Sequence, residues 1–255
     1  GVVGVNWNVT IVPMQVANTD GEINSDACIR AINYASDIWN TSERISILSM
    51  SIGGYSSWPE IETAIRRYQG LFVCSTGNRE QNNDGTIHHY PSFYGSDMHI
   101  DTLQNMITVG RSNINDGKPI GANWGNRTIM LFAPGQNILS TYPEYFCTGI
   151  VRSTIQGYLL DCECTWYDSI SQWVPNGTTH HSNGYHYCSG SSMATPQVSG
   201  VAALLLSINP NLTTQQLKTA ILESVDLPSI NGSNPLENLC VTNGRLNAYN
   251  AVKYV

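Results

Sequence analysis

The chain has 255 residues, of which 41% are hydrophobic and 12% charged, and its formal net charge is −7. This length and hydrophobic share suffice for one large domain with a continuous core. The acidic balance argues against a nucleic-acid surface, which would need a basic patch. No run of eighteen apolar residues is present, so we expect no membrane span either.

Short apolar runs alternate with amphipathic stretches along the chain, and no repeat or linker divides it. Expected strands and helices, in chain order, are strand 9–16, helix 25–39, strand 45–52, helix 57–69, strands 71–74, 106–110 and 130–133, and helices 193–208, 213–225 and 247–255. Such alternation predicts βαβ units and therefore one α/β domain with a mainly parallel central sheet. Pro13 cannot donate to a sheet ladder, which places the first strand at an edge or a bulge.

Two helix starts carry the capping-box pattern, in which a hydroxyl residue is followed three positions later by Glu or Gln. These are Ser57 with Glu60, and Thr213 with Gln216. Gly70 is a natural stop for the first of the two helices.

Residues 144–187 show no clear period, and we interpret them as a segment inserted into the scaffold. Four cysteines lie in or beside this segment: Cys147, Cys162, Cys164 and Cys188. One or two disulfides among them would fit a secreted or extracellular protein. A metal site is the weaker alternative, because Cys-x-Cys is not the usual zinc spacing. Cys28 and Cys74 lie in patterned apolar stretches and are expected as small buried side chains.

The sequence GSSMATP, residues 190–196, opens an apolar stretch with the pattern of a buried helix. Unpaired N–H groups at a helix start favour developing negative charge, and the small neighbours of Ser192 would let a carbonyl group approach. Taken alone, the pattern favours a serine N-cap on a core helix, because serine is a preferred capping residue. A serine nucleophile is the alternative.

Several motifs together resemble the subtilisin-like serine protease (subtilase) family. GSSMATP is similar to that family's Gly-Thr-Ser-Met-Ala-x-Pro, with Ser191 in place of the usual Thr. The other motifs are SIGG at 51–54, STGN at 75–78, Tyr90-Pro91, APGQNILST at 133–141 and GRLNAYNAV at 244–252. They span nearly the whole chain in the family's order. The resemblance implies a three-layer subtilisin-like fold over residues 1–255, as a catalytic domain that is incomplete at its N-terminal side.

The resemblance also implies roles for individual residues. Ser192 would be the nucleophile that forms an acyl-enzyme, and Asn78 would donate its side-chain amide to the oxyanion. Residues implied in the substrate cleft, where an extended peptide adds to a strand end, are Ser51, Gly53, Ser75 and Gly77. Implied partners are a peptide or protein substrate and the protein's own propeptide. No cofactor is required for the chemistry, and a structural calcium ion is implied without identified ligands.

The family orders its catalytic residues Asp, His, Ser along the chain, with the histidine in a His-Gly-Thr-His context. None of the six histidines has that context: His88, His89, His99, His180, His181 and His186. We interpret each as a surface or loop residue. The Asp and His are therefore expected upstream of residue 1, and these 255 residues alone are expected to hydrolyse peptides poorly.

Two functions from different classes fit this pattern. The first is a serine endopeptidase of which this chain is a fragment, and the second is a catalytically inactive module that binds peptides or a partner. A lipase of the α/β-hydrolase type is disfavoured. It would require glycine at the position of Ala194 and a histidine after Ser192, and no histidine follows that serine.

Overall fold

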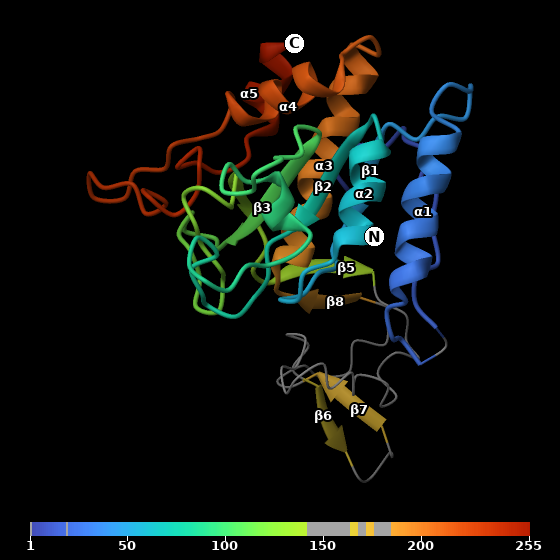
Figure 1. Ribbon diagram of the computed structural model, residues 1–255. Coiled ribbons are helices and arrows are strands. Elements are labelled where there is room, and N and C mark those ends of the chain that lie inside the picture. Colours follow the sequence, from blue (N-terminus) through green and yellow to red (C-terminus); the bar gives the residue numbers. More distant parts are fainter. Residues whose placement is uncertain (1, 19, 142–163, 168–171, 176–184) are drawn as a thin grey trace.

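A parallel sheet of four strands forms the centre of the molecule (Figure 1). The computed structural model describes residues 2–18, 20–141, 164–167, 172–175 and 185–255. The strands lie in the order β1 (Ile47–Met50), β2 (Leu71–Ser75), β3 (Met106–Ser112) and β4 (Leu131–Pro134). Each neighbouring pair is parallel, with Ile47 opposite Leu71 and Val109 opposite Leu131. The expected parallel sheet is confirmed.

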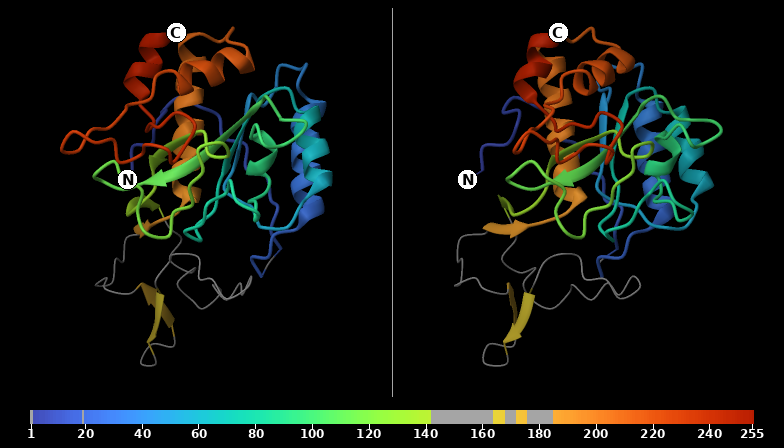
Figure 2. Two further views of the ribbon diagram at one scale, coloured as in Figure 1. Left: turned by 60° about the vertical axis from the view of Figure 1, so that its left-hand side comes forward. Right: turned by 90° about the vertical axis from the view of Figure 1, so that its left-hand side faces the viewer.

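Helices cover both faces of this sheet, as the two views of Figure 2 show. One face carries α1 (Ser25–Asp37) and α2 (Pro59–Arg67), and the other carries α3 (Ser191–Ile208), α4 (Thr214–Leu222) and α5 (Ala248–Tyr254). Successive side chains of a strand point to opposite faces. Accordingly Leu71 and Val73 pack with the α3 layer, whereas Phe72 and Cys74 pack with the α1 layer. The three-layer α/β fold is confirmed.

Helix α3 is the central helix of its layer and contacts all four strands as well as α4 and α5. It has 18 residues with a mean hydropathy of 1.2, and it is the one helix in the described ranges that is long and apolar enough to cross a membrane by these measures. Core helices share this property. Its packing against the sheet accounts for its apolar composition here.

The expected strand at 9–16 is wrong. This stretch has no regular secondary structure and forms no sheet ladder, although Met14 and Val16 pack against the core, and a single bridge joins Ala17 to Ile23 after it. Much of the segment is exposed, with Ile11 at 80%. A strand needs a neighbour to pair with as well as apolar alternation, and no described strand pairs with residues 9–16.

The two capping boxes had different outcomes. At α4, Gln216 N–H donates to the Thr213 hydroxyl at 3.2 Å, and Thr213 N–H donates to Gln216 Oε1 at 2.9 Å, so this box is confirmed. At α2 the expectation is wrong, because Trp58 occupies the N-cap without a side-chain bond and Pro59 opens the helix. Proline suits the first helical position, since its φ is already helical and the N–H it lacks would have no partner there.

A short antiparallel pair precedes α3. Strand β5 (Ile138–Thr141) pairs with β8 (Tyr185–Cys188), with Thr141 opposite Tyr185. Further strands are β6 (Cys164–Tyr167) and β7 (Gln172–Pro175), which pair with each other, and η1 (Ser92–Gly95) is a short 3₁₀ helix. Most of the expected insert at 144–187, including Cys147 and Cys162, lies outside the described residues. The β5–β8 pair nevertheless shows that both ends of this segment meet directly before α3.

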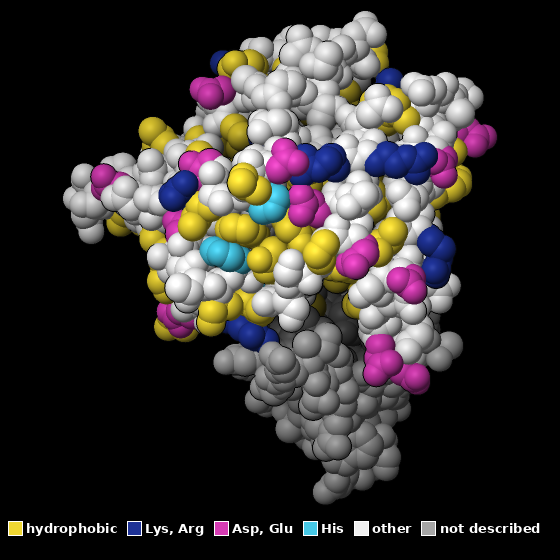
Figure 3. All heavy atoms as spheres, viewed as in Figure 1, with side chains coloured by type: hydrophobic (Ala, Val, Ile, Leu, Met, Phe, Trp, Pro, Cys, Tyr) yellow, Lys and Arg dark blue, Asp and Glu magenta, His cyan; other side chains and the backbone are white. Residues whose placement is uncertain are grey.

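Two cysteines in apolar stretches are buried, as the pattern around them predicts. Cys28 and Cys74 are both buried within the α1 layer, as predicted. On the face drawn in Figure 3, basic and acidic side chains are interspersed rather than gathered by sign. Arg66, for example, pairs with both Glu62 and Asp101.

Candidate active site

The carboxyl ends of β1 and β2 meet the first turn of α3. Neighbouring parallel strands end at the same edge of a sheet, and ligand sites of α/β folds lie at that edge. The Ser51 hydroxyl donates to the backbone oxygen of Ser192 at 2.8 Å, and the Ser192 hydroxyl donates to the backbone oxygen of Ser51 at 3.3 Å. Two residues that lie 141 positions apart in sequence are thus in direct contact.

Asn78 lies at the same junction, after the end of β2. Its Oδ1 accepts a hydrogen bond from the backbone N–H of Ser191 at 2.9 Å. Its Nδ2 faces the turn before the helix, because a Cβ atom built on Gly190 would lie 3.4 Å from that nitrogen. The amide oxygen therefore fixes the side chain to α3, and the amide nitrogen is the donor left for a ligand.

Gly77 is held against α3 by the second serine of the motif. Its N–H donates to the Ser191 hydroxyl at 3.2 Å, and that hydroxyl lies 3.4 Å from the Gly77 carbonyl oxygen. Gly77 has a φ of +93°, and a Cβ there would lie 2.6 Å from Tyr55 Oη. Only glycine fits this position. Ser191 therefore joins the end of β2 to the start of α3.

The interpretation of the motif serine as an N-cap is wrong. Gly190, which has no side chain to act as a cap, is the N-cap of α3, and Ser191 and Ser192 are the first two helical residues. Their hydroxyls bond to Gly77 and Ser51 on the strand ends and not to the N–H groups of their own helix. Ser192 consequently lies among the first-turn N–H groups that have no intrahelical acceptor.

Pro196 inside α3 explains the role of the Ser51 hydroxyl. In a regular helix the N–H of residue 196 would donate to the carbonyl of Ser192, but proline has no N–H. The Ser51 hydroxyl supplies that missing donor. The proline thus leaves an acceptor at Ser192 through which the helix is attached to the end of β1.

We expect the variant Ser51→Ala to lose about 1 to 2 kcal/mol of folding free energy, because the Ser192 carbonyl loses its donor. Adding Pro196→Ala restores an N–H at that position, so the double variant should recover much of the loss. Urea unfolding of the two single variants and the double variant measures this coupling. Ser199→Ala is the control, because the Ser199 hydroxyl bonds to Ser49 and Thr195 and should gain nothing from Pro196→Ala. Strictly additive losses for Ser51 and Pro196 would contradict this account.

The remaining cleft residues differ in exposure. The backbone of Gly53 is exposed, and that of Gly77 is half-buried. Ser75 is the last residue of β2 and is only 3% exposed, so neither its backbone nor its side chain offers much surface to a peptide.

His89 is a loop residue as expected, but it is buried, with 4% of its surface exposed. Burial, together with the positive charge of Arg79, lowers the pKa of His89 to about 3. Its Nδ1 lies 2.9 Å from the Ser92 hydroxyl. Since that hydroxyl donates to the His89 carbonyl oxygen, it accepts from Nδ1–H. The ring is therefore neutral, and its Nε2 carries no proton.

A buried neutral histidine makes folding stability depend on pH. The unfolded chain takes up a proton on His89 near pH 6.5, whereas the folded chain does so only near pH 3. Between these values the unfolded state binds more protons, so stability falls as the pH is lowered. We expect His89→Gln to flatten this decline by a few kcal/mol in urea unfolding from pH 7 to pH 3. An unchanged slope would mean that His89 takes up its proton in the folded protein at about the same pH as in the unfolded chain.

In the described part of the chain, no histidine makes a hydrogen bond with Ser192, whose hydroxyl donates instead to Ser51. A serine hydroxyl needs a base to become a good nucleophile. The described residues therefore bring the predicted nucleophile, Ser192, and the predicted oxyanion donor, Asn78, to one junction, but none of the described histidines is hydrogen-bonded to the Ser192 hydroxyl.

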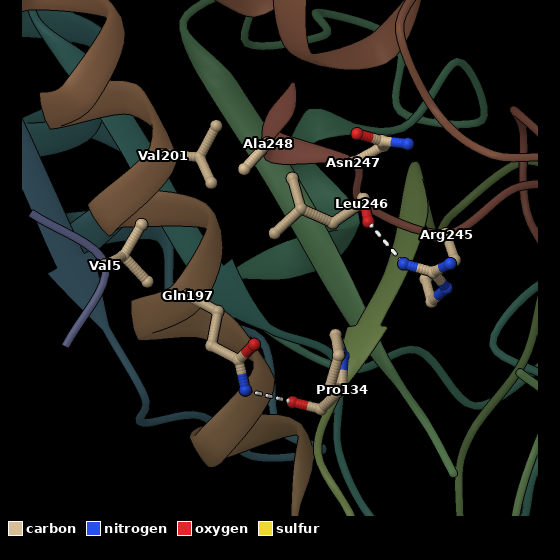
Figure 4. A pocket seen from close by; sticks show the side chains of 8 residues that line it. All are labelled: Val5, Pro134, Gln197, Val201, Arg245, Leu246, Asn247 and Ala248. Atoms are coloured by element: carbon tan, nitrogen blue, oxygen red, sulfur yellow. Dashed lines mark hydrogen bonds between the residues drawn. The ribbon is translucent and has the colours of Figure 1, made fainter. Parts of the chain in front are cut away.

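A separate pocket of about 290 Å³ is lined in part by residues of α3 and β4 (Figure 4). Its lining residues are Val5, Pro134, Gln197, Val201, Arg245, Leu246, Asn247 and Ala248. Gln197 stands where the family often has a histidine, and its Nε2 donates to the Pro134 carbonyl at 2.6 Å. None of the six residues predicted for the serine site lines this pocket.

Comparison with known proteins agrees with this geometry. The model of the subtilase family (peptidase S8) matches residues 1–249, so the chain belongs to this family of serine proteases. Subtilisin DY from Bacillus licheniformis is 25% identical over 87% of the chain, and an intracellular serine protease from Paenibacillus polymyxa is 29% identical over 80%. The chain spans 62% and 48% of the lengths of these two relatives.

Solved structures show the same fold. A cold-adapted subtilisin-like serine proteinase matches 93% of this chain with a TM-score of 0.61 and 23% identity, and the match covers 68% of that protein. A protease from Pseudoalteromonas arctica matches 98% of the chain with a TM-score of 0.66 and 23% identity, over 64% of its own length.

Proposed function

We propose that this chain carries the nucleophile and the oxyanion hole of a serine endopeptidase. The observation that carries the proposal is the placement of Ser192 in the first turn of α3, next to the Asn78 amide whose oxygen is fixed by Ser191. The Ser192 hydroxyl would attack the carbonyl carbon of a peptide bond and form an acyl-enzyme. The Asn78 Nδ2–H and the backbone N–H of Ser192 would donate to the oxyanion that forms.

The general base in this proposal is a histidine outside the 255 residues, with its aspartate. Two observations support it: none of the six histidines has the family's context, and no described histidine is hydrogen-bonded to Ser192. The base would take the Ser192 proton during attack and return it to the leaving amine.

The substrate we propose is a peptide or protein that lies extended along the exposed backbone near Gly53. The protein's own propeptide is a second ligand of this kind. We propose a secreted protein, in line with the relative from Thermus sp. that is named an extracellular serine proteinase, although other relatives are named intracellular. Calcium, which prefers several oxygen ligands, finds no group of three acidic or other metal-binding side chains in the described ranges. No step of the proposal uses it.

The test begins with the protein isolated from its source at its natural length, by mass and N-terminal sequencing. That protein is then treated with a fluorophosphonate, and the modified peptide is identified by mass spectrometry. We expect an adduct on Ser192 in a protein that also contains an Asp strand and a His-Gly-Thr-His motif, together with hydrolysis of peptide substrates. A native protein with neither motif and no adduct would instead support the alternative, a subtilase-like module that binds peptides without cleaving them.

A further inference from the structure

The imidazole of His89 occupies the space between the two cleft glycines. A Cβ atom built on Gly53 would lie 2.4 Å from its Cε1 and 2.7 Å from its Nε2, and one built on Gly77 would lie 2.9 Å from its Cδ2. One edge of the ring thus touches both glycines. These glycines follow β1 and β2, so the ring lies between the two strand ends that face Ser192.

Contacts on several sides fix this ring in place. The backbones of Gly54 and Tyr90 exchange two hydrogen bonds, of 2.9 and 2.7 Å, and so hold the residue after His89 against the β1 end. The Tyr55 ring packs edge-on against the imidazole, with centroids 5.2 Å apart. Ser92 bonds to its Nδ1. A ring held in this way cannot turn aside without breaking these contacts.

The groups around the imidazole are polar, and one of them, Arg79, carries a charge. The His89 ring is neutral, and burial keeps its pKa low. The Arg79 guanidinium lies 4.1 Å over the Tyr55 ring. Asn123 donates to the Tyr55 hydroxyl at 3.0 Å. A side chain that entered between the glycines would meet an imidazole edge and not an open apolar pocket.

We propose that this protein selects substrates with a small, uncharged side chain, that of Gly, Ala or Ser, at the residue before the cleaved bond. The inference rests on the proposed function, because it takes the backbone near Gly53 and Gly77 as the place where the peptide lies. The ring of His89 leaves no depth for an aromatic or long aliphatic side chain between these glycines. His89 is then a residue that determines specificity by filling a subsite.

Equilibrium binding tests this proposal without any need for turnover. Isothermal titration measures the affinity of the Ser192→Ala form of the natural-length protein for two blocked tetrapeptides. One peptide ends in alanine and the other in phenylalanine. We expect the alanine peptide to bind at least about tenfold more tightly, the size of discrimination that pocket shape gives for small apolar differences. His89→Ala, in the same background, should reverse this preference.

His88→Ala is the matched control, because His88 stacks on Phe93 at 3.8 Å and is not among the nearest neighbours of either glycine. It should leave the preference for the alanine peptide unchanged. If His89→Ala does not fold, a second measurement tests the same preference. The unmodified protein is incubated with a mixture of denatured proteins, and the bonds that it cleaves are identified by mass spectrometry. Gly, Ala and Ser should then dominate before the cleaved bond.

The outcomes separate this inference from the proposed function. Tighter binding of the phenylalanine peptide by the unmodified site, or no change in His89→Ala, overturns the inference. Fluorophosphonate labelling of Ser192 without binding of either peptide also overturns it, while the protease proposal stands. A preference for alanine without any labelling supports His89 as the residue that fills the subsite, but it overturns the protease proposal and with it the assignment of this subsite to the residue before a cleaved bond.

Discussion

Replacing Ser192 by alanine is expected to abolish fluorophosphonate labelling and to lower peptide turnover of the natural-length protein by about a millionfold, the size measured in this family for loss of its nucleophile. The motif offers two adjacent serines, and their contacts differ. The Ser191 hydroxyl lies within 3.4 Å of both the N–H and the carbonyl oxygen of Gly77. The Ser192 hydroxyl has one long bond, of 3.3 Å, to the Ser51 carbonyl. The Ser192 hydroxyl is therefore held less tightly than that of Ser191. A base could replace the Ser51 carbonyl as its hydrogen-bond acceptor and then take its proton.

Ser191→Ala is the matched control for this experiment. It removes a hydroxyl from the same helix turn, so the contact between Gly77 and α3 weakens while the Ser192 hydroxyl remains. We expect it to be labelled, more slowly than the unmodified protein, with the adduct still on Ser192. Labelling that persists in Ser192→Ala and disappears in Ser191→Ala would show that Ser191, and not Ser192, is the nucleophile.

The layers of the fold could be predicted because they depend on local patterns. Buried strands such as Leu71–Ser75 show continuous apolar runs, and the 3.6-residue period of α1 was visible at Ile32 and Ala35. The segment 9–16 shows where this reasoning fails. Its alternation predicted a strand, but whether a neighbour pairs with it depends on residues far away in sequence. The predicted start of α2 at Ser57 was wrong, because the helix begins at Pro59 and the capping pattern at Ser57 does not form.

The candidate site was partly predictable for a different reason. Ser192, Asn78 and Ser51 lie in motifs that resemble a known family, and the structure brings these three residues together. His89 was not identified as part of the site, because a histidine in a loop carries no period and no motif. Its significance lies in its contact with Gly53 and Gly77, which are 36 and 12 positions away. The Tyr90-Pro91 turn directly after it was the only available signal.

The two halves of the Asn78 side chain have separate duties, which gives a second large prediction. Its Oδ1 accepts from Ser191 N–H, whereas its Nδ2 is the proposed donor to an oxyanion. Asn78→Asp keeps the acceptor and removes the donor. We expect this variant to lower the turnover number by about a hundredfold to a thousandfold, or about 3 kcal/mol, which is the effect measured in this family for such a donor. The rate of fluorophosphonate labelling should fall with it.

Stability should change in the opposite direction to activity. A carboxylate at position 78 lies at the start of α3, where the N–H groups of the first turn and the helix dipole favour negative charge. We therefore expect the free energy of unfolding of Asn78→Asp to equal or exceed that of the unmodified protein. Asn137→Asp is the control, because it adds the same charge on an exposed loop beside Ser189, outside the site. Urea unfolding and labelling rates, measured on all three proteins, separate the two effects. If Asn78→Asp is as stable as expected and is labelled at the unmodified rate, the amide of Asn78 is not the oxyanion donor, and the N–H groups at the start of α3 act without it.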